Sequence, residues 1–206
     1  MKTKFLAVLM GAALIASSGV AFAQFGSLSK LAGGGAAASG VSAEQIVKNY
    51  VGGAQSVNKA DVKMLRAVGL KDEADRAELQ AKNLTEGATK DSLEEAAKVQ
   101  TESSKALEAI LKNQKVEMDA KSKQQFSDGM ADLARGLIQY VGMGKEAQSF
   151  KPSPAALGAT NSALFVVKTL PDSIKTLGNS LKSSIEFAKT NNIPVPKEAN
   201  DATALL

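Results

Sequence analysis

The chain has 206 residues, and its 25 basic and 21 acidic residues give a formal net charge of +4. It contains no His, Cys or Trp, so imidazole bases and metal ligands, thiol nucleophiles and disulfide bonds are all excluded. Aromatic residues make up only 4% of the sequence, which leaves few platforms for stacking sugars or bases.

The first 23 residues have the pattern of a bacterial signal peptide. Lys2 and Lys4 precede an apolar run at residues 5–15, and the small residues Ala21 and Ala23 would allow cleavage before Gln24. The run is shorter than the roughly 20 residues that span a bilayer, and no second such run follows. We therefore expect export to the periplasm, with passage out of the cell as an alternative, and no transmembrane segment in the mature chain.

Removal of this leader would lower the formal net charge from +4 to +2, because it contains two of the 25 basic residues and none of the 21 acidic ones. Basic and acidic residues are interspersed along the rest of the chain. This pattern argues against a nucleic-acid partner. Residues 24–41 follow as a Gly-, Ala- and Ser-rich tract, which predicts a flexible tether before the folded domain.

The first predicted helix runs from Ser42 to just before Gly69. Ser42 and Gln45 have the spacing of a capping box, and apolar residues then recur at helical intervals. Gly69 has the position of a glycine that ends a helix. Within the helix, Gly52-Gly53 indicates either a kink or a close crossing with another helix.

Two charged helices are predicted next, at residues 72–84 and 93–112. Each has a narrow apolar stripe at heptad spacing on an otherwise charged surface. These stripes could meet each other or a second copy of the chain. Most of the charges fit a solvated helix face and need no functional explanation.

Residues 126–144 are the most apolar run after the leader and predict the central helix of a bundle, with a start as early as Asp119. Asp128, Asp132 and Arg135 share one stripe of this helix. Two carboxylates on one face could bind a cation or act as acid and base. We interpret them as a solvated polar stripe, because no third acidic ligand or His has matching spacing.

Two further helices are predicted from the prolines. Ser153 would cap a helix from Pro154 to Leu170, and Pro171 would begin the last helix, which ends near Asn191. We expect a single all-α bundle of about five to seven helices at residues 42–192, followed by an extended C-terminal tail at residues 193–206.

No motif identifies a known family, a cofactor, a metal site or a catalytic group. The sequence lacks GxxxxGK[ST], a strand-led GxGxxG and GxSxG. Six large side chains at helical spacing are candidates for lining an apolar pocket between the later helices. They are Phe126, Met130, Leu137, Tyr140, Phe165 and Ile174.

Our leading hypothesis is an exported, non-catalytic bundle that binds an envelope protein in a structural or chaperone-like role. It follows from the leader, the missing catalytic residue types and the long charged helices. The alternative is a soluble periplasmic carrier of an apolar small molecule or lipid. A third hypothesis is an enzyme whose catalytic groups are only Asp, Glu, Lys or Ser.

Overall fold

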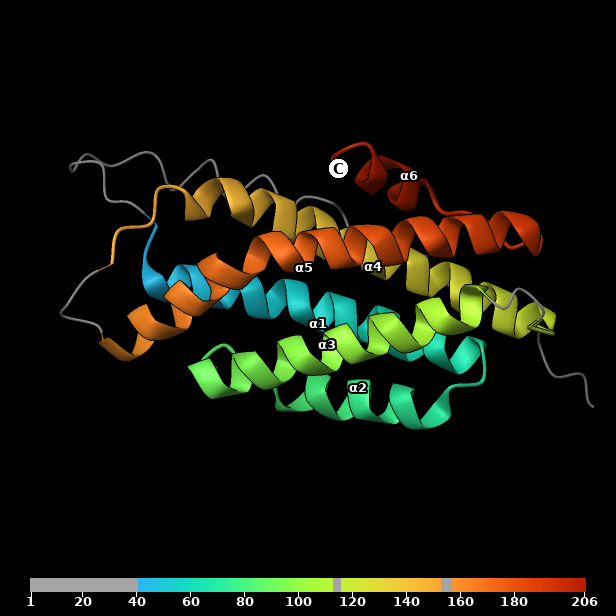
Figure 1. Ribbon diagram of the computed structural model, residues 1–206, viewed down its shortest axis with the longest axis horizontal. Coiled ribbons are helices and arrows are strands. Elements are labelled where there is room, and N and C mark those ends of the chain that lie inside the picture. Colours follow the sequence, from blue (N-terminus) through green and yellow to red (C-terminus); the bar gives the residue numbers. More distant parts are fainter. Residues whose placement is uncertain (1–40, 113–115, 153–156) are drawn as a thin grey trace, which may run out of the picture. The chain divides into compact units, whose positions relative to one another are not determined.

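The computed structural model describes residues 41–112, 116–152 and 157–206, which contain six helices and no strand. The helices are α1 (Ala43–Ala67), α2 (Lys71–Asn83), α3 (Lys90–Lys112), α4 (Ala120–Ala147), α5 (Leu157–Thr190) and α6 (Lys197–Thr203). They confirm the predicted all-α bundle (Figure 1). The predicted leader, residues 24–40 of the predicted tether and the predicted helix start at residues 153 and 154 lie outside the described residues.

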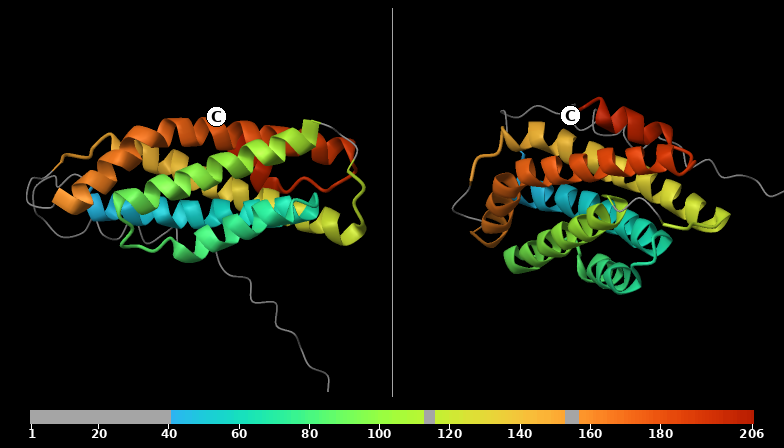
Figure 2. Two further views of the ribbon diagram at one scale, coloured as in Figure 1. Left: turned by 60° about the horizontal axis from the view of Figure 1, so that its bottom comes forward. Right: turned by 45° about the vertical axis from the view of Figure 1, so that its right-hand side comes forward.

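Helix α1 is the centre of the bundle and packs against α2, α3, α4 and α5. Helix α4, predicted as the central element, packs most extensively on α1 and also contacts α5 and α6. Figures 1 and 2 show α1 between α4 and α5 on one side and α2 and α3 on the other. The prediction therefore identified a buried helix correctly, but α1 has the larger number of helix neighbours.

Local capping signals define both ends of α1. The Ser42 Oγ accepts a hydrogen bond from the Gln45 backbone N–H at 3.2 Å, which confirms the predicted N-cap. Gly69 has φ +88°, and the Leu70 N–H donates to the Leu65 carbonyl at 2.8 Å. This arrangement is a Schellman motif, in which glycine adopts the left-handed conformation at little cost.

Glycines allow α1 and α4 to cross closely. A Cβ atom at Gly136 would lie 3.2 Å from the Gly53 carbonyl oxygen, and one at Gly129 would lie 3.1 Å from the Ala60 carbonyl oxygen. Helix α1 is continuous across Gly52-Gly53. Of the two predicted explanations for this pair, the structure therefore supports a close crossing at Gly53.

Helices α2 and α3 form an outer hairpin on α1, and α3 also packs on α5 (Figure 2). The apolar stripes of both helices are buried within this chain through Ala74, Ala77, Leu93 and Leu107. Leu79 of α2 points away from this contact and is 60% exposed. The predicted stripes thus meet α1 and each other.

The predicted division at Pro171 is wrong, because α5 is one helix of 34 residues with Pro171 inside it. Proline lacks the N–H that would bond to the Val167 carbonyl, and Pro171 lies on the exposed side of α5. In Figure 1 the α5 ribbon changes direction in its first half, as expected for a proline kink. Both halves bury apolar residues in the same core: Ala163, Val166, Leu170, Leu177, Leu181 and Ile185.

The C-terminal tail is only partly extended. Residues 193–196 have no regular secondary structure, but Lys197–Thr203 forms α6, which packs on α4 and α5. The Ser127 Oγ donates a 2.7 Å hydrogen bond to the Pro194 carbonyl, and Ala199 is fully buried. These contacts with α4 give the short helix a stability that its length alone would not provide.

Candidate functional site

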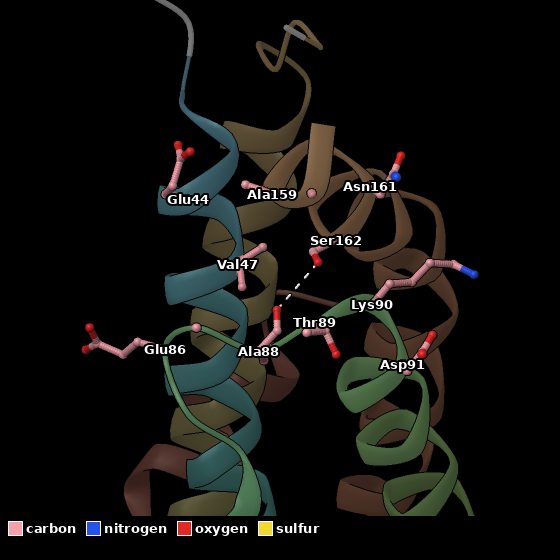
Figure 3. A pocket seen from close by; sticks show the side chains of 12 residues that line it. Glu44, Val47, Glu86, Ala88, Thr89, Lys90, Asp91, Ala159, Asn161 and Ser162 are labelled. Carbon is pink, nitrogen blue, oxygen red and sulfur yellow. Dashed lines mark hydrogen bonds between the residues drawn. The ribbon is translucent and has the colours of Figure 1, made fainter. Parts of the chain in front are cut away.

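A hollow of about 460 Å³ lies at one end of the bundle. Its walls come from the N-terminal ends of α1, α3 and α5 and from the loop between α2 and α3, as Figure 3 shows. Four segments that are distant in the sequence therefore meet here. This arrangement makes the hollow the leading candidate for a binding site.

The floor of the hollow is apolar and is held together by a contact between two of its walls. Val47 and Ala88 are buried, and Ala159 is half-buried beside them. The Ser162 Oγ donates to the Ala88 carbonyl at 3.4 Å, drawn as the dashed line in Figure 3. This long hydrogen bond joins α5 to the loop before α3.

The rim of the hollow is acidic. It includes the carboxylates of Glu44, Glu86 and Asp91, against one lysine, Lys90. Glu86 lies 3.3 Å from Lys48, and Lys90 is paired with a carboxylate of its own helix. Glu44 and Asp91 occupy first turns, where the helix dipole favours negative charge. The hollow thus combines an apolar floor with acidic side chains at its rim.

The six residues predicted to line an apolar pocket have two different environments. Phe126, Met130, Leu137 and Tyr140 of α4 are fully buried, whereas Phe165 and Ile174 of α5 are partly buried against the core. The Phe126 ring packs on Phe187 with centroids 5.3 Å apart. None of the six lines the end hollow, and Ile174 borders a separate groove of about 250 Å³. The apolar pocket between α4 and α5 stays a prediction.

The polar stripe of α4 forms an ion-pair network that joins three helices. The Asp132 carboxylate accepts hydrogen bonds from Lys63 of α1 at 2.6 Å and from Arg135 at 2.8 Å. Arg135 also donates to Glu198 of α6 at 2.8 Å. Asp128 is exposed and accepts a hydrogen bond from a neighbouring side chain of α4. Asp132 is thus held between two cations and connects α4 with α1.

A buried polar cluster was missed from the sequence. The rings of Tyr50 and Tyr140 stack at 5.1 Å with 10° between their planes, and the Tyr140 hydroxyl donates to Gln100 Oε1 at 3.5 Å. Asn58 and Asp61 lie on the same helix as Tyr50 and are 1% and 2% exposed. A signal was available, because Asp61 comes eleven residues after Tyr50 and so falls on its helix face.

Burial controls the acid–base properties of this cluster. It raises the pKa of Asp61 well above the ordinary value. Burial is also the main reason that the pKa of Tyr140 is well above its usual value, and Tyr50 and Asp61 raise it further. Burial raises the pKa of Tyr50 although the nearby hydroxyls of Tyr140 and Ser173 lower it. Neither hydroxyl forms a hydrogen bond of good geometry with the Tyr50 hydroxyl.

Comparison with known proteins finds no matching family, no matching curated protein and no matching solved structure. Within the described ranges, no set of three or more acidic side chains is arranged to hold a metal ion. The same part of the chain has no helix with the length and apolar character needed to cross a membrane.

Proposed function

We propose that the protein is exported to the bacterial cell envelope and acts there by binding a protein partner, without catalysing a reaction. The basic and apolar leader pattern supports export. The observation that carries the binding role is the end hollow, which combines an apolar floor with an acidic rim. Protein interfaces commonly have this arrangement of an apolar centre and a polar border.

The composition of the hollow favours binding over chemistry. Its hydroxyl groups come from Thr89 and Ser162, and its lining holds no imidazole or thiol because the chain has none. Ser162 already donates to a backbone carbonyl. A nucleophilic serine needs an adjacent base, and the lining supplies only carboxylates and one paired lysine.

A substitution that fills the hollow tests this proposal. Gly158 lines the hollow, and a Cβ atom there would meet no atom within 4 Å. Gly142 of α4 has equally open surroundings and is not part of the hollow, so it provides a matched control. Gly158→Phe should fill the hollow and block binding while leaving the fold intact. Gly142→Phe should leave both the hollow and the fold unchanged.

The assay is affinity capture from envelope extract with the mature wild-type protein and both variants as bait. We expect one partner to be recovered with wild type and Gly142→Phe, and its recovery to fall at least about tenfold with Gly158→Phe, a loss equivalent to 1.4 kcal/mol. Equal recovery with all three baits would place binding elsewhere. Recovery of no partner with wild type would overturn the binding function.

Export is tested separately by the N-terminus of the protein recovered from the periplasm. We expect a chain that begins at Gln24, as the leader pattern predicts. The intact mass of the protein in each cell fraction shows whether the leader has been removed and where the mature chain is found. An uncleaved chain found only inside the cell would contradict the localisation without affecting the binding test.

A carrier of an apolar small molecule or lipid is the alternative function. The volume of the end hollow favours it, since pockets for small molecules measure roughly 300–1,000 Å³. Native mass spectrometry of protein purified from its own compartment distinguishes the two. Bound mass that is lost on denaturation would support the carrier, and a bare chain would support the protein partner.

A further inference from the structure

Asp61 is the one carboxylic acid among the buried residues of the described part of the chain. It is 2% exposed, and its Oδ2 atom has no hydrogen-bond partner within those residues. It forms no ion pair there either, in contrast to Asp132 of α4. A carboxylate in this position would be charged, desolvated and unpaired.

Within the described residues, burial is the cause of the raised pKa of Asp61, and no positive charge offsets it. Tyr140 of α4 is the titratable group whose pKa Asp61 raises, and the charged side chains of α4 are exposed or half-buried. The charged side chains of α2, α3 and α5 within the described ranges are exposed or half-buried. The buried polar residues of these three helices are neutral: Gln80 of α2, Gln100, Ser103 and Ser104 of α3, and Thr160, Ser162, Ser180 and Ser184 of α5.

Both side-chain amide atoms of Asn58, which precedes Asp61 by about one helical turn, have no hydrogen-bond partner among the described residues. The same is true of the Ser104 hydroxyl of α3 and the Tyr50 hydroxyl of α1. Ser104 follows Gln100 by one helical turn, and Gln100 accepts from Tyr140. Asn58 of α1 and Tyr140 of α4, which is bonded to Gln100 of α3, thus lie near a carboxyl group whose charged form is disfavoured by burial, because an isolated charge is very costly there.

We propose that Asp61 and these polar neighbours form a proton switch, in which the closed bundle holds a proton on Asp61 and loss of that proton loosens the contact between α1, α3 and α4. The carboxylate would require water, and the unsatisfied amide atoms of Asn58 offer partners that entering water needs.

The direction of the pH dependence follows from linkage. The pKa of Asp61 is higher in the folded chain than its ordinary unfolded value of about 3.9. Its favourable contribution is fully present below that unfolded value and is lost as pH rises through the raised folded pKa. The contribution of Asp61 should therefore make the bundle more stable in acid than at neutral or alkaline pH.

The chain contains a built-in reporter of this cluster. It has two tyrosines and no tryptophan, and both tyrosines, Tyr50 and Tyr140, lie in the stacked pair. Near-ultraviolet circular dichroism in the tyrosine band therefore monitors this part of the core. Thermal unfolding followed in the far ultraviolet monitors the helices as a whole.

The experiment compares wild type, Asp61→Asn and Asp128→Asn at a series of pH values from about 4 to about 9. The asparagine at 61 cannot ionise, and Asp128 is an exposed carboxyl that serves as the control. We expect the wild-type tyrosine signal and thermal midpoint to fall as pH rises. Asp128→Asn should behave in the same way, whereas Asp61→Asn should lose that fall.

A fall of equal size in Asp61→Asn, or no fall in wild type, would overturn the proposal. If Asp61→Asn does not fold, the wild-type protein still decides the matter through the carboxyl ¹³C chemical shift of Asp61. A titration midpoint clearly above that of an ordinary aspartate, with a parallel change in the tyrosine signal, supports the switch. An ordinary midpoint overturns it.

Discussion

The two adjacent glycines of α1 should respond differently to alanine. A Cβ atom at Gly52 would meet nothing within 4 Å, whereas one at Gly53 would lie 2.6 Å from Cδ1 of Tyr140. The Tyr140 ring cannot move aside easily, because it is fully buried and stacked on Tyr50. Replacement by alanine thus places a methyl group in open space at Gly52 and into a close helix crossing at Gly53.

The expected magnitudes follow from two opposing effects. Replacing a glycine inside a helix by alanine stabilises it by about 1 kcal/mol, and this gain applies to both positions. Overpacking of a filled core costs roughly 1–3 kcal/mol, and this cost applies only to Gly53. We expect Gly52→Ala to stabilise the protein, and Gly53→Ala to be less stable than Gly52→Ala by roughly 1–3 kcal/mol.

Thermal unfolding monitored by circular dichroism measures this difference. For a chain of this size, 1 kcal/mol corresponds to about 2–4 °C, so Gly53→Ala should unfold several degrees below Gly52→Ala. Combining Gly53→Ala with Tyr140→Ala should relieve the clash and reveal coupling between the positions. Equal midpoints for the two single variants would refute the close crossing at Gly53.

Three further substitutions test other parts of the fold. Gly69→Ala should destabilise by about 1–2 kcal/mol in urea unfolding, because the residue has φ +88°; an unchanged midpoint would contradict the left-handed helix end. Ser42→Ala should cost about 1 kcal/mol in the same assay by removing the hydrogen bond to the Gln45 N–H, and no loss would argue against the cap. Arg135→Ala should change global stability by less than about 1 kcal/mol, since its pairs are partly exposed. It should, however, accelerate amide hydrogen exchange in α6, and unchanged exchange there would show that Glu198 does not hold that helix.

Local sequence signals were sufficient for both ends of α1 and for the approximate start of α4. Ser42 was predicted as an N-cap and Gly69 as the glycine that ends the helix, and both act as predicted. Asp119 was predicted only as the earliest start of the central helix. The Asp119 Oδ1 accepts from the Ser122 N–H at 2.7 Å, which makes it the N-cap of α4. Capping depends on groups within about one turn, so the sequence alone carries this information.

At Pro171, by contrast, the local sequence signal led to a wrong prediction. The expectation that Pro171 begins a helix considered only the residue and its neighbours, and α5 instead continues through it. The lost hydrogen bond of Pro171 is local, but the apolar residues buried on both sides of it gain their stability from packing on α1, α3 and α4. Tertiary packing outweighed the local preference here, as it also did for α6.

The sequence by itself determined the helical class of this protein, the approximate bounds of four helices and the residue types unavailable to its chemistry, because periodicity, caps and composition are properties of the chain. Tertiary structure decided which helix lies at the centre and where the end hollow forms. It also decided that Asp61 is buried, with no hydrogen-bond partner for its Oδ2 atom among the described residues. These features depend on which distant segments cover one another: Glu44, Ala88 and Ala159 meet only in the folded bundle. The environment of Asp61 likewise exists only once the other helices enclose α1.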